Sequence, residues 1–450
     1  MTVEKAKAFP KKRFFLEMFT RDISLEDCIL DLIDNSIDSL IRTTSIDISS
    51  NLLNPSTTNG DSADSLPLIA VSFSDREFKI SDKCGGIPRK VALDEVFNFG
   101  HTSEALPGQL GAYGIGLKRA IFKIGNLFEI ESKTVDDGFE TTIPVSEWAE
   151  KDEKMEDWTI PLTFTDGVKT PHNAGTTIHI KKLRPEVRMR LSSGSLEKIL
   201  HDKIAQTYSL FLERHVRVTL NKTTVEPNRI PLGGSDKIEA AKEEFEEDGV
   251  RVTLMASLAA RTARNEWLYE RAGWYVLCNG RVVVAADKTD LTGWGDASPI
   301  FHTGKHRGFV GVAYFQSKDP LSLPWTTTKR GLNRESPIYQ KAKNRMSGVA
   351  RPVFTFLNNM YPNEPLAEGR EREIAEQVKP LDLRTVAVKP STVFKVVPEK
   401  RLKPKTVTIS YKVKIEDVER IKKCLRQPSL SGSKVGEHTF KHFLETECPE

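Results

Sequence analysis

One predicted helix carries two polar residues that could handle a water molecule and a metal ion. Residues 24–42 repeat apolar side chains at helical spacing, and Asp31 and Asn35, four positions apart, share one face of that helix. A carboxylate there can polarise a water molecule, and an asparagine carbonyl oxygen can ligate Mg²⁺, which prefers oxygen ligands. The same pair also fits an acidic helix face that is simply solvated.

A third candidate, Asp82, follows a predicted strand. Residues 68–73 and 77–80 alternate apolar and polar side chains, as two strands joined by a short turn do. Asp82 comes directly after them and precedes Gly85 and Gly86. A carboxylate at this point can accept a hydrogen bond from an adenine amino group, and glycines let the backbone approach a flat ring. Aspartate and glycine are equally typical of an ordinary turn.

Three glycines precede a predicted helix at residues 117–124. Gly111, Gly114 and Gly116 permit a tight, mobile loop, and the helix N-terminus offers amides and a positive dipole end to phosphates. Lys118 adds a positive charge. A dinucleotide fingerprint is disfavoured, because a long loop rather than a strand precedes the glycines. A P-loop is excluded, because no Gly-Lys-Ser/Thr ends the run.

In this order and spacing the three motifs resemble those of the GHKL ATPases. This superfamily contains gyrase-type topoisomerases, heat-shock chaperone ATPases, sensor kinases, MutL and the MORC ATPases, and the pattern is most similar to the MORC and MutL branch. Thr176, after Gly175, resembles the Gly-Thr strand whose hydroxyl joins the hydrogen bonds at adenine. Asn98 stands where these proteins carry an asparagine near the ribose and phosphates.

The resemblance implies a role for each residue. Asp31 would be the catalytic base, Asn35 the Mg²⁺ ligand, and Asp82, with Gly86 beside it, the anchor for adenine. The lid over the phosphates would consist of Gly111, Gly114, Gly116 and Lys118. ATP and Mg²⁺ are the implied substrate and cofactor.

A fifth element lies far along the chain. Residues 324–331 resemble the loop by which the gyrase, MutL and MORC branch carries a lysine, here Lys329, from a second domain to the γ-phosphate. Residues 279–281, Asn-Gly-Arg, resemble a turn of that second domain. A lysine after a run of threonines is also common on protein surfaces.

The sequence departs from the family at Asp31, because that branch usually has glutamate there. Aspartate is one methylene shorter, so the water that it activates must lie closer to the helix. General bases contribute roughly a hundred- to ten-thousandfold to rates. We therefore expect slow turnover, while nucleotide binding is unaffected by the change.

The expected fold class is α+β. We expect a two-layer α/β sandwich (Bergerat-type) ATPase domain at residues 1–185 and a mixed α/β transducer domain with the Lys329 loop at 186–361. A linker at 362–405 and a small strand–helix–helix module at 406–450 would follow. The module fits a ribbon–helix–helix DNA-reading dimer, but a small interaction or dimerisation module is the preferred interpretation.

Composition narrows the class of protein. The 450-residue chain has a formal net charge of +4, which is too small to argue nucleic-acid binding from charge alone. Its 5 cysteines are scattered without metal-ligand spacing, which suits reduced thiols. No apolar run fits a signal peptide or a membrane helix. We therefore expect a cytoplasmic protein that does not bind membranes.

These observations predict a slow Mg²⁺-dependent ATPase that works as an ATP-gated clamp and forms a homodimer on binding ATP. DNA repair and mobile-element defence are candidate processes, and DNA and an unidentified protein are candidate partners. The alternatives are a chaperone-like protein-remodelling ATPase and a non-hydrolysing nucleotide sensor. A sensor kinase is disfavoured, because no histidine precedes the helix at residues 24–42.

Overall fold

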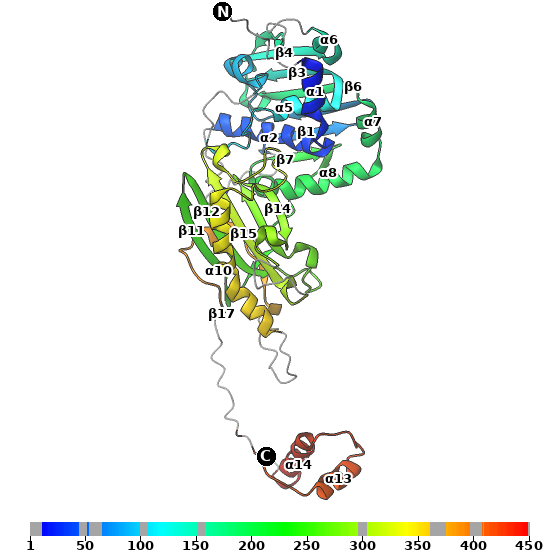
Figure 1. Cartoon of the computed structure of the whole chain (residues 1–450), viewed down its shortest axis with the longest axis vertical. Coiled ribbons are helices and arrows are strands. Elements are labelled where there is room, and N and C mark those ends of the chain that lie inside the picture. Colours follow the sequence, from blue (N-terminus) through cyan, green and yellow to red (C-terminus); the bar gives the residue numbers. More distant parts are fainter. Residues whose placement is uncertain are drawn as a thin grey trace, which may run out of the picture. The chain divides into compact units, whose positions relative to one another are not determined.

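The computed structural model describes residues 11–44, 52–53, 65–99, 107–151, 158–295, 304–360, 375–396, 407 and 409–448. The chain divides into two compact units, Met1–Val397 and Pro398–Glu450. Figure 1 shows the elements of both units.

The first unit begins with an eight-stranded sheet in the order β5-β4-β3-β6-β2-β1-β7-β8. All neighbouring strands are antiparallel except β1 and β7, which are parallel. Its strands are β1 (Leu68–Phe73), β2 (Glu77–Asp82), β3 (Gly125–Lys133), β4 (Asp137–Pro144), β5 (Thr163–Asp166), β6 (Gly175–Leu183), β7 (Arg217–Leu220) and β8 (Thr223–Thr224).

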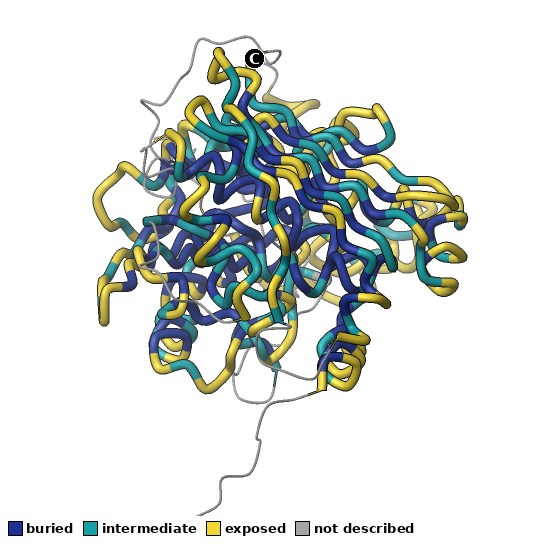
Figure 2. The backbone as a smooth tube through the Cα atoms, turned by 90° about the horizontal axis from the view of Figure 1, so that it is seen from above, coloured by how far each residue is buried: buried dark blue, intermediate teal, exposed yellow. Residues whose placement is uncertain are grey.

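Helices cover one face of this sheet. Figure 1 shows α1 (Lys12–Arg21), α2 (Leu25–Thr44) and α5 (Gly116–Ile124) beside its strands. Alternate strand residues such as Ile80, Phe128 and Ile180 are buried, and the buried backbone is dark blue in Figure 2. The other face is polar, and His179 there lies 2.8 Å from Glu77. The arrangement confirms the two-layer α/β sandwich, with the core between one helical layer and one sheet.

Helix α2 positions most of the site. Ser24 caps it by accepting a hydrogen bond from the amide of Asp27, 3.2 Å away. From Cys28 to Ile41 every residue of the helix is buried except Asn35. The polar face of α2 is therefore covered by other parts of the chain, which excludes the alternative of a simply solvated face.

A second sheet of seven strands follows. It runs β14-β13-β15-β12-β9-β16, with β11 paired to β12, and α10 (Pro337–Asn359) packs on β11, β12 and β15 (Figure 1). Its strands are β9 (Leu232–Gly234), β11 (Ala241–Glu247), β12 (Val250–Ala259), β13 (Gly273–Cys278), β14 (Arg281–Asp287), β15 (Phe309–Ser317) and β16 (Lys379–Pro380). Helices α8 (Gly194–Thr207) and α9 (Ser209–Arg214) lie between β6 and β7 of the first sheet in chain order, and they contact β14 of the second sheet.

Two of the expected domain boundaries, at residue 185 and at the start of the linker 362–405, do not coincide with the limits of the sheets. The first sheet continues past residue 185, because β7 pairs with β1. Residues 375–396, expected within a linker, instead pair with strands of the preceding domain. Strand β16 joins the second sheet beside β9, and β17 (Lys395–Val396) forms a separate two-stranded sheet with β10 (Ile238–Glu239). Leu383 and Val386 in α12 (Leu383–Ala387) are buried. Burial of these apolar side chains holds the segment on the domain.

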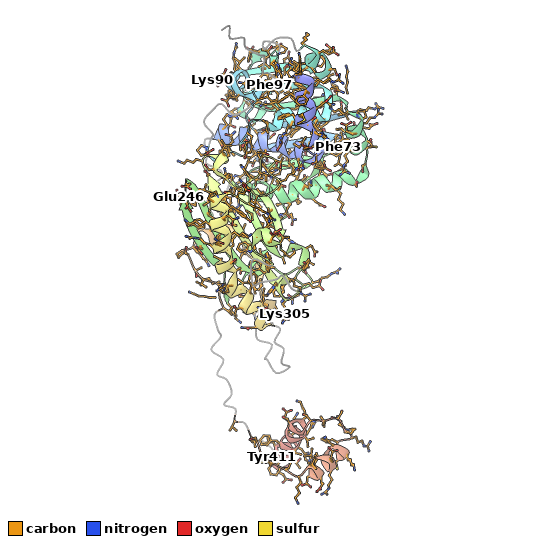
Figure 3. The ribbon with its side chains drawn as sticks, in the orientation of Figure 1. Phe73, Lys90, Phe97, Glu246, Lys305 and Tyr411 are labelled. Atoms are coloured by element: carbon orange, nitrogen blue, oxygen red, sulfur yellow. The ribbon has the colours of Figure 1, made fainter. Side chains whose placement is uncertain are left out.

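The second unit contains α13 (Ile415–Cys424) and α14 (Gly432–Glu447), as expected. The strand expected at the start of this strand–helix–helix module does not form over the described part of residues 406–413. The described residues offer no neighbouring strand there, and an unpaired strand is unstable in water. Tyr411 lies in this segment (Figure 3).

Candidate functional site

One cavity brings together residues from both sheets of the first unit. It lies among α2, the end of β2, the start of β6, the loop before α5, and the loop that follows β15. All predicted site residues line it except Gly86 and Asn98; they are Asp31, Asn35, Asp82, Gly111, Gly114, Gly116, Lys118, Thr176 and Lys329.

Asp31 is a nearly buried carboxylate that faces this cavity. Its exposed fraction is 8%, and it accepts no hydrogen bond from the described part of the chain. Burial raises the pKa of Asp31 to about 6; the Lys329 ammonium opposes this rise and the Asp34 carboxylate adds to it. A poorly solvated carboxylate beside a cavity has the properties that a general base needs.

Asp34, three residues further along α2, has the opposite environment. Its carboxylate accepts hydrogen bonds from the Tyr208 hydroxyl at 2.7 Å, the Arg281 Nε at 3.1 Å and the Lys329 Nζ at 2.7 Å. Burial alone would raise the pKa of Asp34, but the charges of Arg281 and Lys329 outweigh it and hold the pKa below its usual range. Asp34 is therefore an ionised anchor, and Asp31 is the carboxylate that remains available for proton transfer.

Asp34 was not among the predicted site residues, although it lies between Asp31 and Asn35 on the same predicted helix. The role of Asp34 depends on the residues that bind it, and a local motif does not show them: Arg281, for example, is 247 residues away in the sequence. To predict this ion-pair cluster, one would have had to predict that residues 279–281 and the Lys329 loop contact α2.

The Lys329 loop reaches the cavity wall from the second sheet. Lys329 has a positive φ of 54°, and its amide donates to the Thr326 carbonyl at 2.8 Å, which closes a tight turn. The Arg281 Nη1 donates to the Lys329 carbonyl at 2.8 Å. Arg330 pairs with Asp27, outside the cavity lining. These contacts fix the backbone of the loop while the Lys329 ammonium lies at Asp34.

The turn at residues 279–281 makes a second connection between the sheets. The Asn279 Nδ2 donates to the Gln109 carbonyl at 3.1 Å, at the base of the glycine loop. Its Oδ1 accepts from the Ser317 amide at 3.0 Å. The glycine loop and the second sheet are thus joined directly.

Asp82 also lines the cavity. Its Oδ1 accepts from the amides of Cys84 at 3.0 Å and Thr176 at 3.2 Å, and its Oδ2 accepts from the Ser36 hydroxyl at 2.9 Å. Burial raises the pKa of Asp82, and these hydrogen bonds oppose that rise. The Thr176 hydroxyl lies 2.8 Å from the Ser132 hydroxyl. The Oδ2 atom keeps acceptor capacity for a further donor, as a bound adenine amino group requires.

Asn35 is the exposed residue within the buried length of α2, and it lines the cavity. Its amide makes no hydrogen bond within the described ranges, so its carbonyl oxygen can take a ligand. Mg²⁺ is commonly held by one or two protein oxygens together with phosphates. The donor type and its exposure therefore fit the predicted Mg²⁺ role of Asn35.

The glycine loop is held at its start by Asp38. The Asp38 carboxylate accepts from the amides of Leu110 at 2.6 Å and Gly111 at 2.7 Å. At its end, a Cβ on Gly116 would lie 3.1 Å from the Cβ of Asp31. Glycine at this position lets the loop pass close to the candidate base.

Lys118 lines the cavity, but its amine is directed elsewhere. The Nζ donates to the Val96 carbonyl at 2.9 Å, at the end of the short helix Ala92–Val96. Burial lowers the pKa of Lys118 to about 8. In this conformation Lys118 ties that helix to α5.

Two predicted site residues lie outside the cavity lining. The Gly86 carbonyl accepts from the Ser39 hydroxyl at 2.9 Å, so Gly86 fixes the turn behind Asp82. Asn98 is exposed and donates to the Asp94 carbonyl. Their predicted nucleotide contacts therefore have no geometric support here.

Gly86→Ala is expected to destabilise the fold by at least about 2 kcal/mol. Gly86 has a φ of +74°, and an added Cβ would lie 2.2 Å from the Lys133 carbonyl oxygen. Gly249→Ala is the matched control, because Gly249 has a φ of +72° but no atom within 4 Å of the added Cβ. Urea unfolding of both variants checks this; equal losses would mean that backbone conformation alone, and not the close approach, requires glycine.

The family described as Histidine kinase-, DNA gyrase B-, and HSP90-like ATPase matches residues 23–170. Residues 23–170 therefore form a GHKL-type ATPase domain. The match includes Asp31, Asn35, Asp82 and the glycine loop, and it ends before Thr176 and Lys329. ATP is the ligand that such domains bind.

A search of curated proteins finds no match to this chain. Within the described ranges, no helix has the length and apolar character needed to cross a membrane.

Proposed function

We propose that this chain is a slow Mg²⁺-dependent ATPase that acts as an ATP-gated dimeric clamp in a DNA-related process such as repair or mobile-element defence. The observation that carries the proposal is the ion pair between Lys329 and Asp34, three residues from Asp31. This ion pair joins the loop after β15 of the second sheet to the cavity. A change at the phosphates would therefore move Lys329 and, through its loop, the second domain.

In this mechanism Asp82 holds the adenine ring, and the loop from Gly111 to Gly116 closes over the phosphates. Asn35 would hold Mg²⁺, which neutralises phosphate charge when it is bound. Asp31 takes a proton from the attacking water, and Lys329 faces the negative charge that develops on the γ-phosphate. Asp34 and the γ-phosphate would compete for the Lys329 ammonium. The position of Lys329 would therefore differ between the ATP-bound and the ATP-free protein.

The pH dependence of turnover tests the role of Asp31. Its pKa is raised to about 6, and a general base works only when deprotonated. We expect kcat to rise with pH through about 6 and to level off above about 7. A kcat profile without this acid limb would contradict the assignment of Asp31.

Asp31→Asn should remove turnover without unfolding the protein. The folded-state pKa of Asp31 lies above its ordinary value of 3.8, so the ionised carboxylate destabilises the folded state increasingly as pH rises from about 4 to 6. At pH 8 this penalty is complete, of order 3 kcal/mol. The neutral variant is therefore expected to unfold at a higher temperature than wild type, which separates loss of the base from loss of the fold.

Steady-state ATP hydrolysis, with and without duplex DNA, tests the proposed function directly. Turnover that DNA stimulates and that Asp31→Asn removes supports the DNA-linked clamp. Turnover that DNA leaves unchanged at all salt concentrations counts against DNA as the partner, because phosphate contacts make DNA binding strongly salt-dependent.

A non-hydrolysing nucleotide sensor is the second candidate, and the aspartate at position 31 favours it. The shorter side chain leaves more space between the carboxylate and the γ-phosphate. Saturable ATP binding without turnover at pH 8 would support the sensor and exclude the ATPase.

A further inference from the structure

A second cavity lies next to the nucleotide cavity in the first unit. Its volume is about 870 Å³, and cavities of roughly 300–1,000 Å³ are typical of small-molecule sites. Its walls are the end of α2, the residues before β1, the turn after β2, the turn between β3 and β4, and residues 171–174. The proposed ATPase mechanism makes no use of this cavity.

The turn after β2 is shared by the two cavities. Asp82 and Ile87 line the nucleotide cavity, whereas residues 83–86 between them line the second cavity. The Cys84 amide donates to the Asp82 carboxylate at 3.0 Å, and the Cys84 carbonyl accepts from the Thr43 hydroxyl at 2.9 Å. Thr43 lines the second cavity. One residue of the turn is therefore bonded both to the proposed adenine anchor and to a wall of the second cavity.

Most of the lining of the second cavity is apolar. Leu40, Leu66, Pro88 and Val135 belong to it, and Val135 is 47% exposed. Transfer of an apolar ligand from water to such a lining is favourable, because it removes apolar surface from water on both sides. The lining therefore fits a ligand with an apolar body.

The charged residues of the lining favour an anion. They are Arg42, Lys83, His172 and Arg217, with Asp136 and Asp137 as the acidic members. Asp137 is already engaged, because its carboxylate accepts from the Thr134 hydroxyl at 2.9 Å and the Arg89 amide at 3.2 Å. Arg42 and Lys83 form no ion pair within the described part of the chain. An acidic group on a ligand can therefore pair with them without displacing another carboxylate.

We infer that this cavity binds a small organic anion with an apolar body, such as an aromatic carboxylate or sulfonate, and that this ligand strengthens ATP binding. Its acidic group lies at Arg42 and Lys83, and its apolar body lies against Leu66 and Val135. The bound anion restrains residues 83–86, the turn that holds Asp82. Less conformational freedom is then lost when adenine binds at Asp82, so each ligand raises the affinity for the other.

Anilinonaphthalene sulfonate is a suitable probe, because it joins an apolar aromatic body to an acidic group. Phenylnaphthylamine has the same body without the sulfonate. Fluorescence titrations use the full chain with a saturating non-hydrolysable ATP analogue, so that the nucleotide cavity is filled. The sulfonate should bind saturably, and the uncharged compound should bind at least about tenfold more weakly. Equal affinities would overturn the assignment of an anion site.

The double variant Lys83→Glu/His172→Glu places negative charge in the cavity and should weaken sulfonate binding by at least about tenfold. Both side chains are exposed, and the Lys83 amide still donates to the Leu68 carbonyl, so the fold should survive. Arg42 stays unchanged because it also lines the nucleotide cavity. Lys79→Glu is the matched control, since Lys79 is an exposed residue of β2 outside the lining. Fluorescence that the double variant leaves unchanged would come from another apolar surface and would overturn the inference.

The link to ATP is measured by calorimetry with the same nucleotide analogue. Saturating anilinonaphthalene sulfonate should lower the dissociation constant of the analogue by about fivefold or more in wild type, and the analogue should lower that of the sulfonate by the same factor. The double variant should lose this response. Release of the sulfonate by the analogue would place the probe in the nucleotide cavity and overturn the second site. An analogue affinity that the bound sulfonate leaves unchanged or lowers would overturn the coupling, while ATP binding and the proposed ATPase would stand.

Discussion

Asp82→Asn is expected to weaken ATP binding by about tenfold to a hundredfold, because a donor would replace the acceptor that we propose for adenine. The Asp82 Oδ1 is already used by the amides of Cys84 and Thr176. In the variant the remaining oxygen must stay at those two amides, so the new NH₂ group lies toward Ser36 and the cavity. Two amino groups would then face each other, and a lost charge-assisted hydrogen bond costs about 1.5–3 kcal/mol. Isothermal titration calorimetry measures the change.

The fold should survive this substitution, because the Ser36 hydroxyl can rotate to accept from the new NH₂ group. Glu77→Gln is the matched control, since Glu77 lies on the same strand and contacts His179 on the polar face of the sheet. Its ATP affinity should equal that of wild type. Unchanged affinity in Asp82→Asn, with normal thermal unfolding, would refute the assignment of Asp82 as the adenine anchor.

Local sequence signals were sufficient wherever the structure depends on one segment. The periodicity of residues 24–42 predicted α2, and the alternation of 68–73 and 77–80 predicted the β1–β2 hairpin; both are confirmed. Spacing on α2 also indicated that Asp31 and Asn35 share a face, and both line the cavity. Helical and strand periods depend on geometry within a few residues, so a sequence can reveal them.

Local sequence patterns did not predict side-chain positions that depend on residues far away in the sequence. Lys12, in the unpredicted helix α1, is buried because its Nζ donates to the Trp148 carbonyl at 2.9 Å and lies over the Trp148 ring. Lys118 was expected at the phosphates, yet its amine donates to the Val96 carbonyl. In both cases the choice among several acceptors depends on tertiary packing. Local patterns carry no information about that choice.

Lys329→Ala is expected to leave ATP affinity within about threefold of wild type and to lower kcat by about a hundredfold. In the proposed mechanism Lys329 would face the charge that develops at the γ-phosphate, whereas Asp82 would hold adenine elsewhere in the cavity. Asp34 keeps Arg281 and Tyr208 as partners, so its charge stays compensated in the variant. Steady-state hydrolysis and equilibrium ATP binding, measured on the same preparation, separate the two effects.

The pH profile of this variant carries a second, independent signal. The Lys329 ammonium lowers the pKa of Asp31 against the effect of burial. Its removal should therefore raise the pKa of Asp31 above about 6 and move the acid limb of kcat to higher pH. Arg330→Ala, the next residue of the same loop, contacts Asp27 outside the cavity lining and should change neither kcat nor the limb. If Lys329→Ala hydrolyses ATP at the wild-type rate with an unshifted limb, the loop only joins the two domains and the ion pair with Asp34 is structural.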